Sequence, residues 1–282
     1  MAKCRFCGAE LPKGASTCAY CNSDNSAAKN SLIIESGSLV IKDGATLVIG
    51  DGRQSAEAGE AGDIFEAVSF KNLEAVTAFA ASGEAVNGRN DYGQTPLFIA
   101  VKLGYKRIAA FLLEKGAEVN VSDIAGSTPL IIAALNGRDK IMKLLLARSA
   151  NVNARDGDGT TPLIGACNAG SIECVRLLVE HGADVNGLNN QNLNPLHFAA
   201  QFGSVEIARY LIEKGTDVNR KGEQDNTPLH SAAIKNRLDM VRCLVEHGAD
   251  VNAVTSQSKK TPAGLARSRA VKEYLRSVAK KA

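Results

Sequence analysis

The stretch TPLHSAAIKNRLDMVRCLVEHGADVN, residues 227–252, predicts two short helices joined by a turn. Thr227 and Pro228 are typical of a helix start, because a threonine side chain caps the first turn and a proline there loses no hydrogen bond. The alanine pair at 232–233 allows close packing, and apolar residues then recur at the spacing of a second helix. Gly248 ends that helix, because glycine readily adopts the left-handed conformation of a helix C-cap.

Two markers from this stretch recur in phase at intervals of 33 residues, which indicates an array of internal repeats. The first marker is Pro-Leu preceded by Thr or Asn, and it occurs at Thr95-Pro96-Leu97, Thr128-Pro129-Leu130, Thr161-Pro162-Leu163, Asn194-Pro195-Leu196 and Thr227-Pro228-Leu229. The second marker is Val-Asn, three residues after a glycine in all units but one, and it occurs at Val86-Asn87, Val119-Asn120, Val152-Asn153, Val185-Asn186, Val218-Asn219 and Val251-Asn252. Chance does not keep two markers in phase over five periods.

These motifs resemble those of the ankyrin-repeat family over about residues 62–282. The resemblance implies a mainly α fold, an ankyrin-repeat solenoid of helix-turn-helix units with β-turn fingers. Residues 92–257 correspond to five full repeats, and residues 62–91 correspond to an N-terminal cap. Residues 258–282 correspond to a C-terminal cap, whose many Lys and Arg residues allow its outer face to meet water.

Four cysteines near the start form two Cys-x-x-Cys pairs, Cys4 with Cys7 and Cys18 with Cys21. Two thiolates in such a tight turn can grip one metal ion, and four complete the closed tetrahedral site that zinc prefers. Residues 1–24 resemble the short zinc ribbons at the start of many bacterial proteins. We therefore expect a structural Zn²⁺ ion there, with an iron–sulfur cluster, disulfides, free thiols or a redox pair as alternatives.

Residues 25–61 are expected to form a linker and a short β-strand segment. Three apolar triplets, which begin at Leu32, Leu39 and Leu47, are separated by Gly-containing turns and predict a small antiparallel meander. Three strands are marginally stable alone, so the first cap, the zinc module or a second copy of the chain should cover them. Self-association through residues 31–50 is therefore a hypothesis.

The ankyrin resemblance implies protein binding through the turn tips and the inward, concave face of the first helices. A fold resemblance does not name the partner. At these positions several residues are apolar where a solvated repeat would be polar, and an exposed apolar strip is what a binding surface requires. The candidate partner-binding residues are Tyr92, Leu103, Leu135, Leu193, Phe202 and Ile234. The competing interpretation is that some of them contact the next repeat and belong to the core.

The repeats show no recognisable group of acid, base and nucleophile and no phosphate-binding Gly-Lys-Ser/Thr loop, so we expect a non-catalytic protein. Two histidines follow Pro-Leu, where the resemblance implies an imidazole bonded to the turn backbone. Two others precede a helix-ending glycine, where a cation suits the helix dipole. The three cysteines of the repeats fall at small or apolar positions and should be packed in the core. These residues are His197, His230, His181, His247, Cys167, Cys174 and Cys243.

The net charge of +3 is unevenly spread, because residues 258–282 carry eight basic side chains and one acidic one. Residues 31–257 have a net charge of −6, which argues against a nucleic-acid-binding main surface. The basic tail could contact an acidic partner, so the alternative function is a nucleic-acid-associated regulator that uses the zinc ribbon and this tail. The sequence has no long apolar run and no signal-peptide core, and its seven cysteines fit reduced thiols, so we expect a cytoplasmic protein.

Overall fold

A computed structural model describes five short strands near the N-terminus together with residues 62–82, 86–202 and 204–280. The chain divides into two compact units, Met1–Ala56 and Glu57–Ala282. The first unit contains two antiparallel sheets, with strand orders β1-β2 and β3-β4-β5. The strands are β1 (Ala2–Lys3), β2 (Glu10–Leu11), β3 (Ile33–Glu35), β4 (Ser38–Val40) and β5 (Thr46–Leu47). The expected zinc ligands Cys4, Cys7, Cys18 and Cys21 lie outside the described residues.

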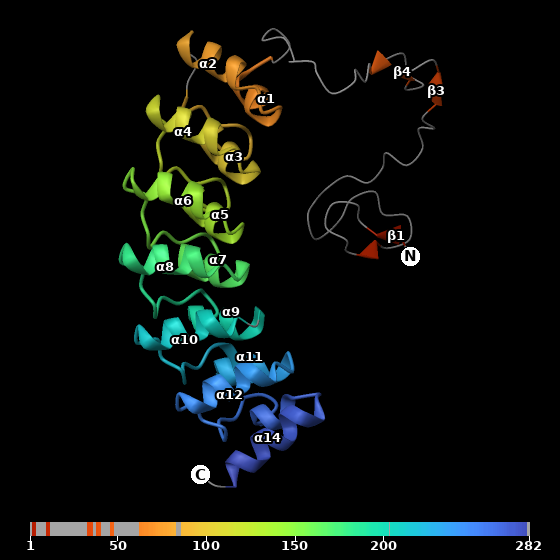
Figure 1. Ribbon diagram of the computed structural model, residues 1–282, viewed down its shortest axis with the longest axis vertical. Helices are drawn as coiled ribbons and strands as arrows, with labels where there is room; N and C mark the ends of the chain where they lie inside the picture. Colours follow the sequence, from red (N-terminus) through yellow and green to blue (C-terminus); the bar gives the residue numbers. More distant parts are fainter. Residues whose placement is uncertain are drawn as a thin grey trace. The chain divides into compact units, whose positions relative to one another are not determined.

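The second unit is a stack of helix pairs that follow one another in chain order (Figure 1). The first helices of the pairs are α1 (Ile64–Ser69), α3 (Pro96–Leu103), α5 (Pro129–Leu135), α7 (Pro162–Ala169), α9 (Pro195–Phe202), α11 (Pro228–Ile234) and α13 (Pro262–Leu265). The second helices are α2 (Leu73–Ala81), α4 (Lys106–Glu114), α6 (Asp139–Leu146), α8 (Ile172–Glu180), α10 (Val205–Glu213), α12 (Leu238–Glu246) and α14 (Arg269–Ala279). A short 3₁₀ turn, η1 (Glu223–Asp225), precedes α11. The expected mainly helical solenoid is confirmed.

Five of the first helices begin at Thr-Pro markers, as the sequence predicts, and α9 begins at the equivalent Asn194-Pro195. The Thr95 hydroxyl accepts a hydrogen bond from the Phe98 amide at 3.2 Å, and Pro96 occupies the first turn. Thr128 and Thr161 cap α5 and α7 in the same way. Each hydroxyl satisfies an amide that has no partner within its helix, which is how the marker fixes the helix start.

The second helices α4, α6, α8, α10 and α12 are followed by residues with positive φ, which is the C-cap that the glycines predict. Gly116, Gly182 and Gly248 have φ angles of 85°, 85° and 86°. Ser149, which replaces the glycine of its unit, adopts the same left-handed conformation at a φ of 61°. A residue with a Cβ atom adopts this conformation at a cost, so the surrounding repeat must hold Ser149 in place.

One continuous core runs through the array, from Ile64 in α1 to Leu275 in α14. The alanine pairs of the first helices are fully buried, and they let neighbouring helices approach closely. Cys167 and Cys174 are 0% exposed, and Cys243 is 1% exposed, so the prediction that they are core residues is confirmed. Burial raises the pKa of all three thiols, which keeps them protonated.

The asparagine of each of the first five Val-Asn markers bridges two adjacent repeats; the sixth, Asn252, makes no such bridge to a described residue. The Asn186 side-chain nitrogen donates to the Gly215 carbonyl at 3.1 Å, and its side-chain oxygen accepts from the Asp217 amide at 2.9 Å. We call this pair of hydrogen bonds an asparagine bridge. The other asparagine bridges are made by Asn87, Asn120, Asn153 and Asn219. The bridges explain why the Val-Asn marker keeps step with the helices.

None of the helices in the described parts of the chain is long and apolar enough to cross a membrane.

Candidate functional site

The loops that lead into the first helices project as fingers, and each finger is joined to the next by one backbone hydrogen bond. The donors are the amides of Ile124, Gly157, Asn190, Glu223 and Ser256, at 2.8–3.1 Å from the carbonyl of a residue in the preceding finger. We define the groove face as the surface formed by the fingers 90–94, 123–127, 156–160, 189–193, 222–226 and 255–260 and by the first helices. The hydrogen bonds hold the fingers in one register, so side chains from adjacent fingers meet.

The first four fingers share an internal support that the fifth lacks. In each, the side-chain oxygen of the first residue accepts hydrogen bonds from backbone amides two and four residues later; these first residues are Asn90, Asp123, Asp156 and Asn189. Gly222 occupies the corresponding position of the fifth finger and has no side chain to do this. Gln224 adopts a positive φ angle of 61° there, which Tyr92, Ala125, Asp158 and Gln191 at the corresponding positions do not; the next residue has a positive φ in all five fingers. The fifth finger therefore has a different backbone path.

The missing side chain of Gly222 makes room for Leu193 of the preceding finger. A Cβ atom at Gly222 would lie 2.3 Å from the Leu193 Cδ2 atom, so a residue with a side chain at this position would require the end of the Leu193 side chain to move. Leu193 and Gly222 are thus a matched pair. Other fingers have polar residues at the position of Leu193, for example Gln94 and Thr160.

A pocket of about 360 Å³ opens on the groove face beside this pair. Its apolar lining comes from Leu193, Ile234 and Leu265, which belong to three successive repeat units. The remaining lining residues are polar, and Glu223 is the only charged one; they are Gln191, Glu223, Gln224, Asn226, Thr255 and Ser258. A concave apolar site with a polar rim is the usual form of a recognition pocket.

The structure separates the six predicted partner-binding residues into two groups. Large exposed fractions are found for Tyr92 (64%), Phe202 (46%), Ile234 (42%) and Leu103 (41%). Leu135 and Leu193 are half-buried. Only Leu193 and Ile234 line the pocket together.

Leu135 packs against the next repeat, as the competing interpretation of the apolar strip allows. A Cβ atom at Gly165 in α7 would lie 3.1 Å from the Leu135 Cγ atom. Other repeats carry a side chain at the position of Gly165, for example Ile99 and Ile132. Leu135 therefore fills space inside the array.

Three further residues of this surface are not indicated by the repeat markers alone. Ile124 is 76% exposed, and its amide bonds to the carbonyl of Tyr92, so the two residues lie on adjacent fingers. Phe70 is 71% exposed, and it lies one repeat before Leu103 in the sequence, a spacing that could have found it. Leu265 lies in the C-terminal cap, where no repeat marker draws attention to it.

Two buried histidines tie the fingers of the pocket to the helices. The Nε2 atom of His197 bonds to the Asn226 carbonyl at 3.0 Å, and that of His230 bonds to the Lys260 carbonyl at 3.2 Å. This confirms the structural role expected for both. Burial lowers the pKa of His197 to about 4 and also lowers that of His230, so both rings are neutral at pH 7.

The other two histidines close their helices. The Nδ1 atoms of His181 and His247 lie 2.8 Å and 2.6 Å from the carbonyls of Leu177 and Cys243. Each ring therefore adds a side-chain contact to a last-turn carbonyl that also accepts a hydrogen bond from the backbone amide of the same histidine. Within the described residues, no group of three or more His, Cys, Asp or Glu side chains could hold a metal ion.

Two models of ankyrin repeats match the sequence. The model of three ankyrin copies matches residues 64–156 and 130–222, and the model of many copies matches residues 203–245 and 229–268. No curated protein matches the sequence significantly.

Solved structures give the same result. The ankyrin repeat domain of Bcl-3, described as a unique member of the IκB protein family, is 32% identical at a TM-score of 0.63; the match covers 77% of this chain and 100% of that one. The human ASB11 ankyrin repeat domain is 27% identical at a TM-score of 0.68, with 76% of this chain and 96% of that one covered. The chain belongs to the ankyrin-repeat family.

Proposed function

We propose that the chain binds a partner protein through its groove face, and that the pocket lined by Leu193, Ile234 and Leu265 anchors the partner. Ankyrin repeat domains generally mediate protein–protein interaction, which supports binding as the function. The pocket is the observation that carries the proposal, because an apolar site inside a polar rim excludes water around an inserted side chain.

The chemistry of the lining favours a partner segment that combines an apolar side chain with a neighbouring cation. The apolar side chain would contact Ile234, which is 42% exposed and therefore still has apolar surface to bury. Glu223 is the only charged lining residue, so a Lys or Arg beside the inserted side chain would meet an opposite charge.

The substitution Ile234→Lys is expected to abolish capture of this partner while the array stays folded. Lys102 occupies the corresponding position of the first full repeat, so the fold accommodates this side chain. A charge in the pocket removes the apolar contact, and we expect affinity to fall by roughly tenfold or more. The measurement is affinity capture from the native cell extract with quantitative mass spectrometry.

Val254→Lys is the matched control. Val254 is 45% exposed, it does not line the pocket, and Lys221 occupies its corresponding position in the preceding repeat. Proteins captured by the wild type and by Val254→Lys but lost with Ile234→Lys would support the pocket. Equal capture by all three chains would refute it.

We further propose that the cysteines Cys4, Cys7, Cys18 and Cys21 bind one structural zinc ion. The donor set supports this, because four thiolates in two Cys-x-x-Cys pairs fill the coordination of zinc and leave no position for a substrate. Bound zinc would supply folding energy to a segment of about twenty residues, which is too short to bury a sizeable core.

Thiol counting tests the zinc site and the buried cysteines together. The chain has seven cysteines, of which Cys167, Cys174 and Cys243 are buried in the array. We expect no rapid reaction with a thiol reagent in the native protein, four reactive thiols after a chelator is added, and all seven in denaturant. Four reactive thiols before chelation would contradict zinc binding, and early reaction of the other three would contradict their burial.

A further inference from the structure

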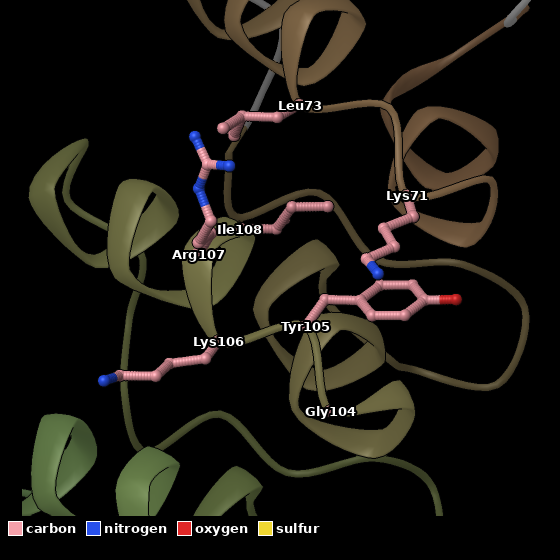
Figure 2. Close-up of a pocket in the computed structure, with 7 residues that line it drawn as sticks. All are labelled: Lys71, Leu73, Gly104, Tyr105, Lys106, Arg107 and Ile108. Carbon is pink, nitrogen blue, oxygen red and sulfur yellow. The ribbon is translucent and has the colours of Figure 1, made fainter. Parts of the chain in front are cut away.

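A second pocket, of about 300 Å³, lies between the turn of the N-terminal cap and that of the first full repeat (Figure 2). It is lined by Lys71, Leu73 and residues 104–108, and these residues belong to neither the fingers nor the first helices of the groove face. Figure 2 shows the Lys71 ammonium above the Tyr105 ring, with Ile108 between this pair and the Arg107 side chain; Lys106 points away. Apolar side chains thus line the pocket between two cations, the Lys71 ammonium and the Arg107 guanidinium.

Lys71 adopts a left-handed backbone conformation. At the corresponding position other repeats have Gly or Asn, which adopt this conformation more readily. Its φ angle is 59°, in the left-handed region. At the corresponding positions of other repeats, Gly104, Gly137 and Gly170 have φ angles of 82°, 62° and 69°, and Asn236 has one of 57°. A lysine is strained there, since its Cβ atom crowds the backbone. In this conformation the Lys71 ammonium lies 5.5 Å from the centre of the Tyr105 ring.

The second cation opposes the local helix dipole. Arg107 lies in the first turn of α4, which contains no acidic residue, and no side chain caps this helix. Acidic residues occupy the first turns of α2, α6, α8, α10 and α12, namely Glu74, Asp139, Glu173, Glu206 and Asp239. A helix N-terminus carries partial positive charge and stabilises anions, so Arg107 adds repulsion where these helices have attraction.

These cations have no acidic partner in the array. Within 62–82, 86–202 and 204–280, no ion pair involves Lys71 or Arg107. Glu74 follows Leu73 in the sequence but does not line the pocket. Among the described residues, no ion pair therefore balances the positive charge at this pocket.

The corresponding pocket between α10 and α12 shows that the geometry does not require this charge. Its lining includes Asp239 beside Arg237, so the charges balance. The Arg237 guanidinium also donates to the Phe202 carbonyl at 2.8 Å and is occupied by that contact. The positive charge and the aromatic ring of the pocket in Figure 2 therefore come from the residues at this site, and the geometry of the repeat does not require them.

We propose that the pocket at Lys71 and Arg107 binds an acidic segment of a partner protein. A carboxylate would meet the Arg107 guanidinium and the uncapped amides at the start of α4, and Lys71 would approach a second one. An apolar side chain between the two acids would contact Leu73, Tyr105 and Ile108. Charge complementarity identifies the occupant, and the site is independent of the groove face.

The test uses the peptide Ac-Glu-Asp-Leu-Glu-Asp-NH₂ and the ¹⁵N-labelled full-length chain. We expect saturable amide shift changes at Lys71, Leu73 and residues 104–108. The matched peptide with Gln and Asn in place of the acids should not bind, and the peptide with Ser in place of Leu should bind more weakly. Equal binding of the uncharged peptide, or shift changes elsewhere, would overturn the proposal.

Variants drawn from the chain's own repeats separate binding from folding. Arg107→Glu introduces the residue found at Glu173 and Glu206, and Lys71→Gly introduces the glycine of other repeats. Each should weaken peptide binding by about tenfold or more, since each removes a charged contact. Each should also raise Tm by about 2–4 °C. Arg107→Glu removes the repulsion between a cation and the helix dipole, and Lys71→Gly removes the backbone strain. A structural role alone would predict a lower Tm.

Lys140→Glu is the matched control, since Lys140 corresponds to Arg107 one repeat later and lies outside the pocket. It should leave peptide binding almost unchanged. An equal loss of binding in Lys140→Glu and Arg107→Glu would mean that the peptide responds only to the overall charge of the chain. That result would overturn the proposed binding site. Glu57 and Glu60 are acidic residues that precede the array in the sequence. If the peptide bound only after both were changed to Gln, the occupant would be this chain's own segment and the proposal of a partner would be wrong.

Discussion

Lowering the pH from about 7 to about 4 is expected to reduce the free energy of unfolding by about 3 kcal/mol through His197 alone. Its pKa is lowered from 6.5 to about 4, mainly by burial. Between these values the unfolded chain binds a proton that the folded chain does not, so protonation favours unfolding. The stabilisation is complete above pH 6.5 and is lost as the pH falls toward 4. The lowered pKa of His230 acts in the same direction.

The substitution His197→Ile isolates this contribution from that of the carboxylates. Ile131 and Ile164 occupy the corresponding positions of other repeats and are buried, so the side chain fits. The variant loses the hydrogen bond to the Asn226 carbonyl and should be less stable at pH 7. Denaturant unfolding at several pH values should show this difference shrinking on acidification. A difference that does not change with pH would contradict the prediction, as would a native NMR titration of His197 near pH 6.5.

Removal of one asparagine bridge by Asn186→Ala is expected to lower the free energy of unfolding by about 2 kcal/mol. The substitution removes both hydrogen bonds that join Asn186 to the following repeat, at Gly215 and Asp217. Array stability depends on the interfaces between neighbours, so one weakened interface should also divide the array into two parts that unfold separately. Native-state hydrogen exchange measures this as lower protection on one side of the interface.

Asn136→Ala is the control for the lost amide. Asn136 is also exposed, but its side chain donates to the Ile132 carbonyl within its own repeat, at 2.8 Å. We expect it to change stability less and to leave unfolding cooperative. Equal effects of the two substitutions would mean that the bridges do not couple the repeats.

The repeat markers were enough to predict the helices of the array. Thr95 and its counterparts cap helices, and the glycines after the second helices adopt positive φ, because these roles depend on the local backbone. The sequence shows the Val-Asn marker but does not show which contact the asparagine makes. Its partners, such as Gly215 for Asn186, lie 29 residues away in the sequence, so the bridge becomes visible only when the repeats are stacked.

The candidate site was only partly predictable because it depends on compensating residues in different repeats. Leu193 lines the pocket since Gly222 leaves space for it, whereas Leu135 turns into the array since Gly165 leaves space there. Both leucines have the same apolar character in the sequence. Which of them contributes to a surface depends on a glycine about 30 residues later, and repeat periodicity alone does not reveal that pairing.

The asparagine bridges also determine how the array would respond to a pulling force. Each bridge and each finger hydrogen bond joins one repeat to its immediate neighbour, so a load applied along the stack passes through these contacts in series. The weakest contact then yields first, and the repeats that remain stacked keep their shared part of the core. Each released unit of 33 residues would lengthen the chain by about 110 Å. Such an array extends in steps and can rewind from the repeats that stay folded, which is the behaviour of a spring.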